Sequence, residues 1–175
     1  PNICLISEEI EAKQMTLDDV VNYIAEIVAA RAAKGNNFGT VLIPEGRIEF
    51  IPAMKRLIAE LNDYLAANGS EFAMIKKSEQ INYITKHLSP ENAAIYSTLP
   101  EAVARQLTLD RDPHGNVQVS LIETEKLLAE MVGRRLAEMK AEGTYIGKFA
   151  TQTHFFGYEG RCAAPSNFDA DYCYS

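Results

Sequence analysis

Short apolar runs and amphipathic stretches alternate along the first seventy residues. The runs at 2–6 and 39–43 contain almost no polar positions, which is typical of buried strands in a parallel sheet. Between them, apolar residues recur every three or four positions. This spacing predicts a helix that opens with a capping box at Thr16 and Asp19 and ends near Gly35.

A second helix is predicted from about 50 to 67, because its apolar residues also recur at helical spacing. Asn68 and Gly69 then favour an end to the helix. The resulting order of strand, helix, strand and helix is the pattern of a parallel α/β sheet. Ligands of such sheets bind beyond the carboxyl ends of the strands, and Glu45 stands just past the second predicted strand.

The middle of the chain changes character and favours helices with frequent breaks. Ser89 followed by Pro90 predicts one helix start, and the segment 98–101 predicts another. A capping box at 120–123 predicts a long helix that continues to about 142, and Met54, Met131 and Met139 are interpreted as core residues. We expect 70–141 to be a mostly helical insertion in an α/β unit made of 1–69 and 142–175.

Strand-like residues return after Gly143. The segment 149–156 mixes β-branched and aromatic residues and leads into a loop rich in glycine. If this segment is a third strand of the sheet, Glu45 and Arg161 could line one crevice. His154 is interpreted as a half-buried residue whose ring is satisfied by backbone groups.

Composition narrows the class of protein. The apolar fraction is 47% and the net charge is −7, which is ordinary for a globular domain and unfavourable for binding a nucleic-acid backbone. No apolar stretch approaches the length of a membrane span. The cysteines Cys4, Cys162 and Cys173 are odd in number and widely spaced, so neither a disulfide scaffold nor a zinc site is indicated. We therefore expect a cytoplasmic protein.

The loop at 157–161 holds the most suggestive chemistry. Arg161 offers a planar fork of donors that suits phosphate oxygens, and Gly157 and Gly160 allow the backbone to approach a bound group closely. Ser166, with Asp169 three positions later, predicts a helix start, where anions are favoured. These residues could build a sugar-phosphate pocket.

Several long stretches resemble the pyrophosphate-dependent phosphofructokinases of the long-chain bacterial and plant group. They are the segments at 5–13, 37–46, 110–120, 123–128 and 154–175, so the resemblance covers almost the whole chain. It implies an α/β fold with a partial, Rossmann-like parallel sheet and a helical insertion. It also implies that the parent enzyme transfers a phosphoryl group between pyrophosphate and fructose 6-phosphate.

The resemblance assigns substrate-binding roles to Glu45, Tyr158, Glu159, Gly160 and Arg161. Glu45 would accept hydrogen bonds from sugar hydroxyls, and Arg161 would pair with the 6-phosphate. Tyr158 would donate to the ligand or pack beside it, and Gly160 would keep the turn tight. The alternatives are structural: a glutamate favoured by a helix dipole, a salt-bridged arginine and a core tyrosine.

The same resemblance predicts what this stretch lacks. The family's Gly-Gly-Asp-Asp loop, its Thr-Ile-Asp-x-Asp segment and its Met-Gly-Arg motif do not occur here. We therefore expect an internal piece of such an enzyme, without catalytic residues or a metal site and inactive alone. The parent is implied to use Mg²⁺ and to form a homo-oligomer. Two alternatives stay open: an ATP-dependent relative, and a non-catalytic interaction module that docks through 70–141.

Overall fold

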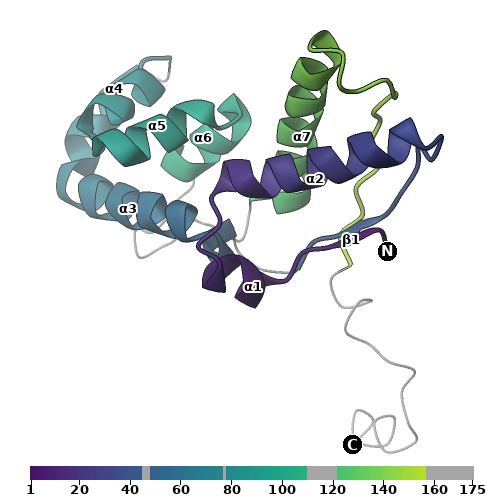
Figure 1. Cartoon of the computed structure of the whole chain (residues 1–175). Helices are drawn as coiled ribbons and strands as arrows, with labels where there is room; N and C mark the ends of the chain where they lie inside the picture. The colour runs from purple at the N-terminus through teal and green to yellow at the C-terminus, as the bar shows by residue number, and fades with distance from the viewer. Residues whose placement is uncertain (45–47, 77, 110–121, 157–175) are drawn as a thin grey trace, which may run out of the picture.

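The computed structural model describes residues 1–44, 48–76, 78–109 and 122–156 (Figure 1). These residues are mostly helical and contain a small parallel sheet. In chain order the elements are β1 (Ile3–Cys4), α1 (Ser7–Ala12), α2 (Leu17–Ala33), β2 (Val41–Leu42), the 3₁₀ helix η1 (Ile48–Phe50), α3 (Pro52–Ala73), α4 (Gln80–His87), α5 (Pro90–Thr98), α6 (Glu101–Leu109) and α7 (Thr124–Ala141).

The sheet joins β1 and β2 in parallel, with Ile3 opposite Val41 and Cys4 opposite Leu42. Helices α1 and α2 form the connection between the strands, so the predicted strand–helix–strand order is confirmed. The prediction that the second strand is buried is wrong, since Val41 is 36% exposed and Leu42 is 46% exposed. The reason is that no further described strand flanks β2.

Helix α2 begins as its capping box predicts. The Thr16 hydroxyl accepts from the backbone N–H of Asp19 at 3.1 Å, and the Asp19 carboxylate accepts from the N–H of Thr16 at 2.8 Å. These bonds satisfy donors that the first turn of a helix would leave free. The helix ends before Gly35, whose φ of +79° suits a residue without a Cβ.

Helix α3 continues past its predicted end at Asn68 and Gly69. Asn68 has non-helical dihedrals, φ −122° and ψ 17°, so a kink stands where the end was predicted. The side-chain amide of Asn68 donates to the carbonyl of Tyr64 at 2.9 Å. The chain resumes helical geometry beyond the kink because Phe72 packs into the core, and this tertiary contact overrides the local propensity.

Helices α5 and α6 confirm the predicted starts, with Pro90 in the first turn of α5. Helix α7 begins at Thr124, later than the predicted capping box at 120–123. Ser120 lies outside the described residues. Ile122 is buried before the helix starts, so this apolar side chain enters the core from a non-helical stretch.

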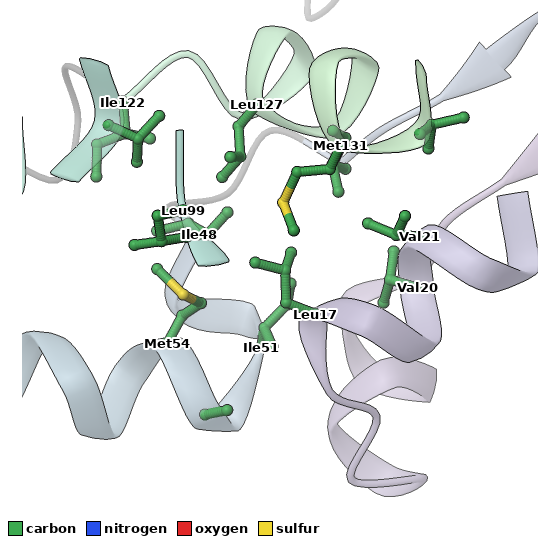
Figure 2. Packing of buried hydrophobic residues seen from close by; sticks show 14 of the residues in the cluster. Leu17, Val20, Val21, Ile48, Ile51, Met54, Leu99, Ile122, Leu127 and Met131 are labelled. Carbon is green, nitrogen blue, oxygen red and sulfur yellow. The ribbon is translucent and has the colours of Figure 1, made fainter. Parts of the chain in front are cut away.

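One continuous apolar core connects helices from both predicted parts of the chain. Helix α2 packs against α7, and α3 packs against η1 and α5. Figure 2 shows where they meet: Leu17 and Val21 of α2 face Met131 of α7, with Met54 of α3 nearby. Met54, Met131 and Met139 are all buried, which confirms their interpretation as core residues. The domain boundary at 70 and 141 stays a prediction.

The predicted third strand is absent, because residues 149–156 are described and form no strand. Their backbone finds no partner strand among the described residues, and residues 150–156 are exposed. Within the described part of the chain, no helix combines the length and apolar character needed to cross a bilayer.

Candidate functional site

The residues assigned to substrate binding lie outside the described residues. These are Glu45, Tyr158, Glu159, Gly160 and Arg161. The crevice between Glu45 and Arg161 therefore stays a prediction. The structure does describe the segments that lead to these residues.

The first of these segments is the carboxyl end of β2. Ile43 and Pro44 follow the strand directly and are half-buried. The chain therefore leaves β2 at the carboxyl edge of the sheet, the edge at which open parallel sheets bind ligands. The parallel neighbour β1 ends at the same edge, where Leu5 is buried and Ile6 is exposed. The position predicted for Glu45, just past a strand end, is thus compatible with the observed sheet.

Acidic side chains follow β1 at this edge. Glu8 and Glu9 lie in the first turn of α1 and are exposed, and Glu9 pairs with Lys13 at 3.1 Å. No group of three or more carboxylate, histidine or cysteine side chains in the described part of the chain is arranged to hold a metal ion. These glutamates are therefore a solvated helix start.

The second segment leads toward the predicted loop at 157–161. Phe155 and Phe156 are 69% and 66% exposed. His154 is also exposed, with its ring 6.3 Å from that of Phe156, so the prediction of a half-buried histidine is wrong. Its neighbours 150–156 are exposed as well.

One hydrogen bond ties the two approaching segments together. The side-chain amide of Asn37, shortly before β2, donates to the carbonyl of Lys148 at 2.9 Å, across 111 positions of sequence. Beside it, Gly147 fits closely against Tyr145, where an added Cβ would lie 2.6 Å from the hydroxyl oxygen. The bond therefore joins the segment before β2 to the segment after α7. Sequence reasoning missed this contact, because no spacing rule relates residues so far apart.

An open hollow of about 430 Å³ lies between α7 and the segment that follows Phe149. The Phe149 ring rests on the helix at Gly133, where an added Cβ would make an ordinary van der Waals contact with it at 3.5 Å. The polar groups here are Lys126 and Glu130, with Thr151 and Thr153. Lys126 already binds Glu123 at 2.7 Å, an ion pair that raises the pKa of the lysine. The hollow is a surface feature without a free charged group that would select a ligand.

A polar and aromatic cluster holds α4 on α3. The Tyr64 hydroxyl donates to Tyr83 at 3.3 Å, and the Tyr83 hydroxyl donates to Glu71 at 3.0 Å. The hydrogen bond with Tyr64, burial and the nearby Glu71 carboxylate raise the pKa of Tyr83. The His87 ring packs at a tilt against both tyrosine rings. Its Nδ1 lies 2.8 Å from the Tyr83 carbonyl, which can only accept, so Nδ1 carries a proton. All of these contacts join residues of α3 and α4, so the cluster fixes the packing of the two helices.

Comparison with known proteins identifies close relatives. The chain is 66% identical over 174 residues to a pyrophosphate–fructose 6-phosphate 1-phosphotransferase of Porphyromonas gingivalis, covering 99% of this chain and 32% of the relative. It is 54% identical to the protein of that name from Treponema pallidum, covering all of this chain and 31% of the relative. It is 50% identical to the β subunit of the Solanum tuberosum enzyme, covering 29% of that protein.

No protein-family model matches the chain. The relatives nevertheless match almost every residue of this chain, although the chain spans only about a third of their own length. Identity at this level over 174 residues requires common ancestry, and it agrees with the motifs at 37–46 and 154–175. This chain is therefore homologous, over its whole length, to a stretch of the pyrophosphate–fructose 6-phosphate 1-phosphotransferases.

Proposed function

We propose that the full-length protein transfers a phosphoryl group between pyrophosphate and the 1-hydroxyl of fructose 6-phosphate, in a reversible step that gives fructose 1,6-bisphosphate. The observation that carries this proposal is the identity of 50–66% with three proteins of that name from distant organisms. All three names specify pyrophosphate, which favours it over ATP as the phosphoryl donor. The reaction would be a glycolytic step in the cytoplasm.

Within that reaction, this chain would supply part of the sugar-phosphate site. Glu45 would accept hydrogen bonds from sugar hydroxyls, and its charge would repel the phosphate and so orient the ligand. Arg161 would donate two bonds to the 6-phosphate. Tyr158 and Glu159 would contact the ligand near a turn that Gly160 would keep tight. Support comes from the position of Pro44 at the carboxyl edge of the sheet.

The remaining parts of the reaction would come from elsewhere in the full-length protein. Mg²⁺ would neutralise charge on the pyrophosphate oxygens, but the described residues contain no cluster of three side chains suited to it. We propose that the metal site and the aspartate base lie outside this chain, which is then inactive alone. The finer fold assignment, a Rossmann-like sheet of the phosphofructokinase type, and assembly into a homo-oligomer belong to the same proposal.

Kinetics of the full-length protein test the site assignment. Glu45→Gln and Arg161→Ala should each raise the KM for fructose 6-phosphate by about 10- to 100-fold, the effect of losing a charged hydrogen bond. The KM for pyrophosphate should change much less. Glu26→Gln and Arg56→Ala, which alter exposed residues on α2 and α3, are the matched controls. Unchanged sugar-phosphate kinetics in both site variants would refute the assignment.

Two further assays separate the alternatives. The full-length protein should turn over with pyrophosphate and not with ATP, whereas the reverse result would establish an ATP-dependent enzyme. The 175-residue chain should show no turnover above a buffer blank, and calorimetry should show binding of fructose 6-phosphate weaker than micromolar. If neither donor supports turnover of the full-length protein, the non-catalytic interaction module becomes the better explanation.

A further inference from the structure

Asn68 and Gly69 form a pair with covalent chemistry of its own. Asparagine is a chemically labile residue, because the peptide nitrogen of the next residue can attack its side-chain amide. A following glycine hinders this attack least, since it has no Cβ. Asn68 is the one asparagine of the sequence that precedes a glycine. Gly69 is exposed, and a Cβ added there would meet nothing within 4 Å, so no neighbouring atom packs over that side of the backbone.

The kink in α3 stands at the same pair. Asn68 has non-helical dihedrals inside a helix that runs from Pro52 to Ala73. Its side-chain amide donates to the Tyr64 carbonyl at 2.9 Å, which directs the amide toward the preceding turn of the helix. Ring closure needs the amide carbon to turn toward the Gly69 nitrogen. This hydrogen bond must therefore break before the reaction can occur.

One side chain of α4 spans the kink. The Tyr83 hydroxyl accepts from Tyr64 at 3.3 Å and donates to Glu71 at 3.0 Å. Tyr64 precedes Asn68 in α3, whereas Glu71 follows it. Tyr83 therefore restrains the two parts of α3 relative to each other, and such restraints determine how often a local segment opens.

We propose that Asn68 is a site of spontaneous deamidation and that opening of the kink, restrained by Tyr83, sets its rate. The Gly69 nitrogen gives up its proton and bonds to the side-chain carbon of Asn68. The bond from that carbon to the amide nitrogen breaks, and ammonia leaves with the proton. Water then opens the cyclic imide at one of its two carbonyls, which gives aspartate or isoaspartate. This inference does not depend on the proposed substrates.

The product cannot restore the hydrogen bond at the kink. A carboxylate at position 68 has no N–H to donate, so its oxygens would face the Tyr64 carbonyl oxygen. Its charge also stands three residues before the Glu71 carboxylate, and like charges that are neighbours on one helix face destabilise the helix. Deamidation therefore loosens the end of α3 and its attachment to α4.

Peptide mapping of the full-length protein by mass spectrometry tests the modification. At mildly alkaline pH, the peptide that contains Asn68 should acquire the mass shift of deamidation at least about 10-fold faster than the peptide that contains Asn82. Asn82 is exposed on α4 but precedes a bulky tyrosine. Gly69→Ala, which has room for its Cβ, should slow the reaction at Asn68 to the rate at Asn82. Equal rates at Asn68 and Asn82 in the wild type would overturn the proposal.

The restraint by Tyr83 has its own test. Tyr83→Phe removes the hydroxyl that joins the two sides of the kink, so the folded protein should deamidate at Asn68 several-fold faster. Tyr23→Phe, which changes an exposed tyrosine on α2, is the matched control and should leave the rate unchanged. In concentrated urea all three proteins should react at one rate, because the kink is lost. A folded Tyr83→Phe protein that reacts no faster than the wild type would refute the gating by Tyr83.

The effect of the product is measured separately. Asn68→Asp reproduces one product of the reaction, and it should speed amide hydrogen exchange at 69–73 while leaving 53–63 unchanged. Unaltered exchange at 69–73 would show that deamidation does not loosen the helix.

Discussion

The Glu60 carboxylate on α3 binds both the backbone N–H and the hydroxyl of Ser89, at 2.7 and 2.9 Å, across 29 positions of sequence. Ser89 is the N-cap of α5, but its own side chain makes no capping bond within that helix. Asn92, in the first turn of α5, donates to the same carboxylate. A charged side chain from one helix therefore caps the next, and its negative charge complements the positive end of the α5 dipole.

Replacing Glu60 should loosen the packing of α5 on α3. Glu60→Ala should lower the free energy of unfolding by about 1.5–3 kcal/mol, since a charged acceptor is lost and Asn92, which is buried, loses its partner. Glu60→Gln keeps one acceptor oxygen and should cost less. Urea unfolding measures both, with Glu26→Gln on the exposed face of α2 as the control. Equal stability of the Glu60→Ala and Glu26→Gln variants would contradict this role.

The stabilisation by Glu60 should depend on pH. Burial alone would raise the pKa of Glu60, but hydrogen bonds from Asn92 and from the N–H and hydroxyl of Ser89 lower it below its ordinary 4.5. A group with a lowered pKa in the folded state stabilises above its unfolded pKa and stops doing so as the pH falls through its folded pKa. The stability difference between the wild type and Glu60→Gln should be constant near neutrality and shrink below about pH 4.5. Urea titrations across that range measure it, and a difference that grows on acidification would exclude the mechanism.

The capping box of α2 should contribute a smaller amount to stability than Glu60. Thr16→Ala should lower the free energy of unfolding by about 1 kcal/mol, because the N–H of Asp19 loses its acceptor. Thr16→Ser restores the hydroxyl and serves as the control. Hydrogen bonds from the Thr16 side chain and backbone lower the pKa of Asp19, so this contribution should also fade in acid, as the pH drops through the lowered pKa. Thermal unfolding of the two variants side by side decides the point.

Tyr96 should hold α5 and α6 together through its hydroxyl. The side chain is buried, and its hydroxyl donates to the carbonyl of Ala104 at 3.0 Å and lies 3.3 Å from the Thr108 hydroxyl. Tyr96→Phe should cost about 1 kcal/mol, the typical net value of one such bond. The exposed Tyr23 offers the same substitution as a control, with an expected change near zero. Chemical denaturation that shows no difference between them would refute the assignment.

Gly147 should be intolerant of any side chain. An added Cβ would lie 2.6 Å from the Tyr145 hydroxyl oxygen, and it would also meet the Asn37 side chain, which binds Lys148. Gly147→Ala should therefore release the segment that follows α7, seen as faster amide exchange at 145–149. Gly69→Ala, in α3, meets nothing within 4 Å and should be neutral or stabilising by up to about 1 kcal/mol. Similar exchange in the two variants would show that the fit at Gly147 is not needed.

Predictions of helix starts and ends were reliable where the conformation depends only on residues within one helical turn. The capping box at Thr16, the positive φ of Gly35 and the Pro90 helix start all need only neighbouring residues, and all were confirmed. The predicted start of α7 was too early, because Ile122 packs into the core before the helix begins. The predicted end of α3 was also too early, because the packing of Phe72 into the core extends that helix.

For the candidate site, strand order predicted only where Glu45 stands relative to the sheet. The position just past β2 follows from strand order, while the roles of Glu45 and Arg161 come from resemblance and stay predictions. The Asn37–Lys148 bond could not be predicted, since its partners are 111 positions apart and both residue types are common on surfaces.

By itself, the sequence determined the strand–helix–strand order at the start of the chain, the core methionines and the homology to the phosphotransferases. Hydrophobic periodicity and helix capping depend on residues that are close in sequence, and shared ancestry is read from the residues themselves. Only the tertiary structure decided that residues 149–156 form no strand, that β2 is exposed, and that Glu60 caps α5. A strand needs a partner for its backbone groups and a carboxylate needs donors, and in a folded chain both can come from residues that are distant in sequence.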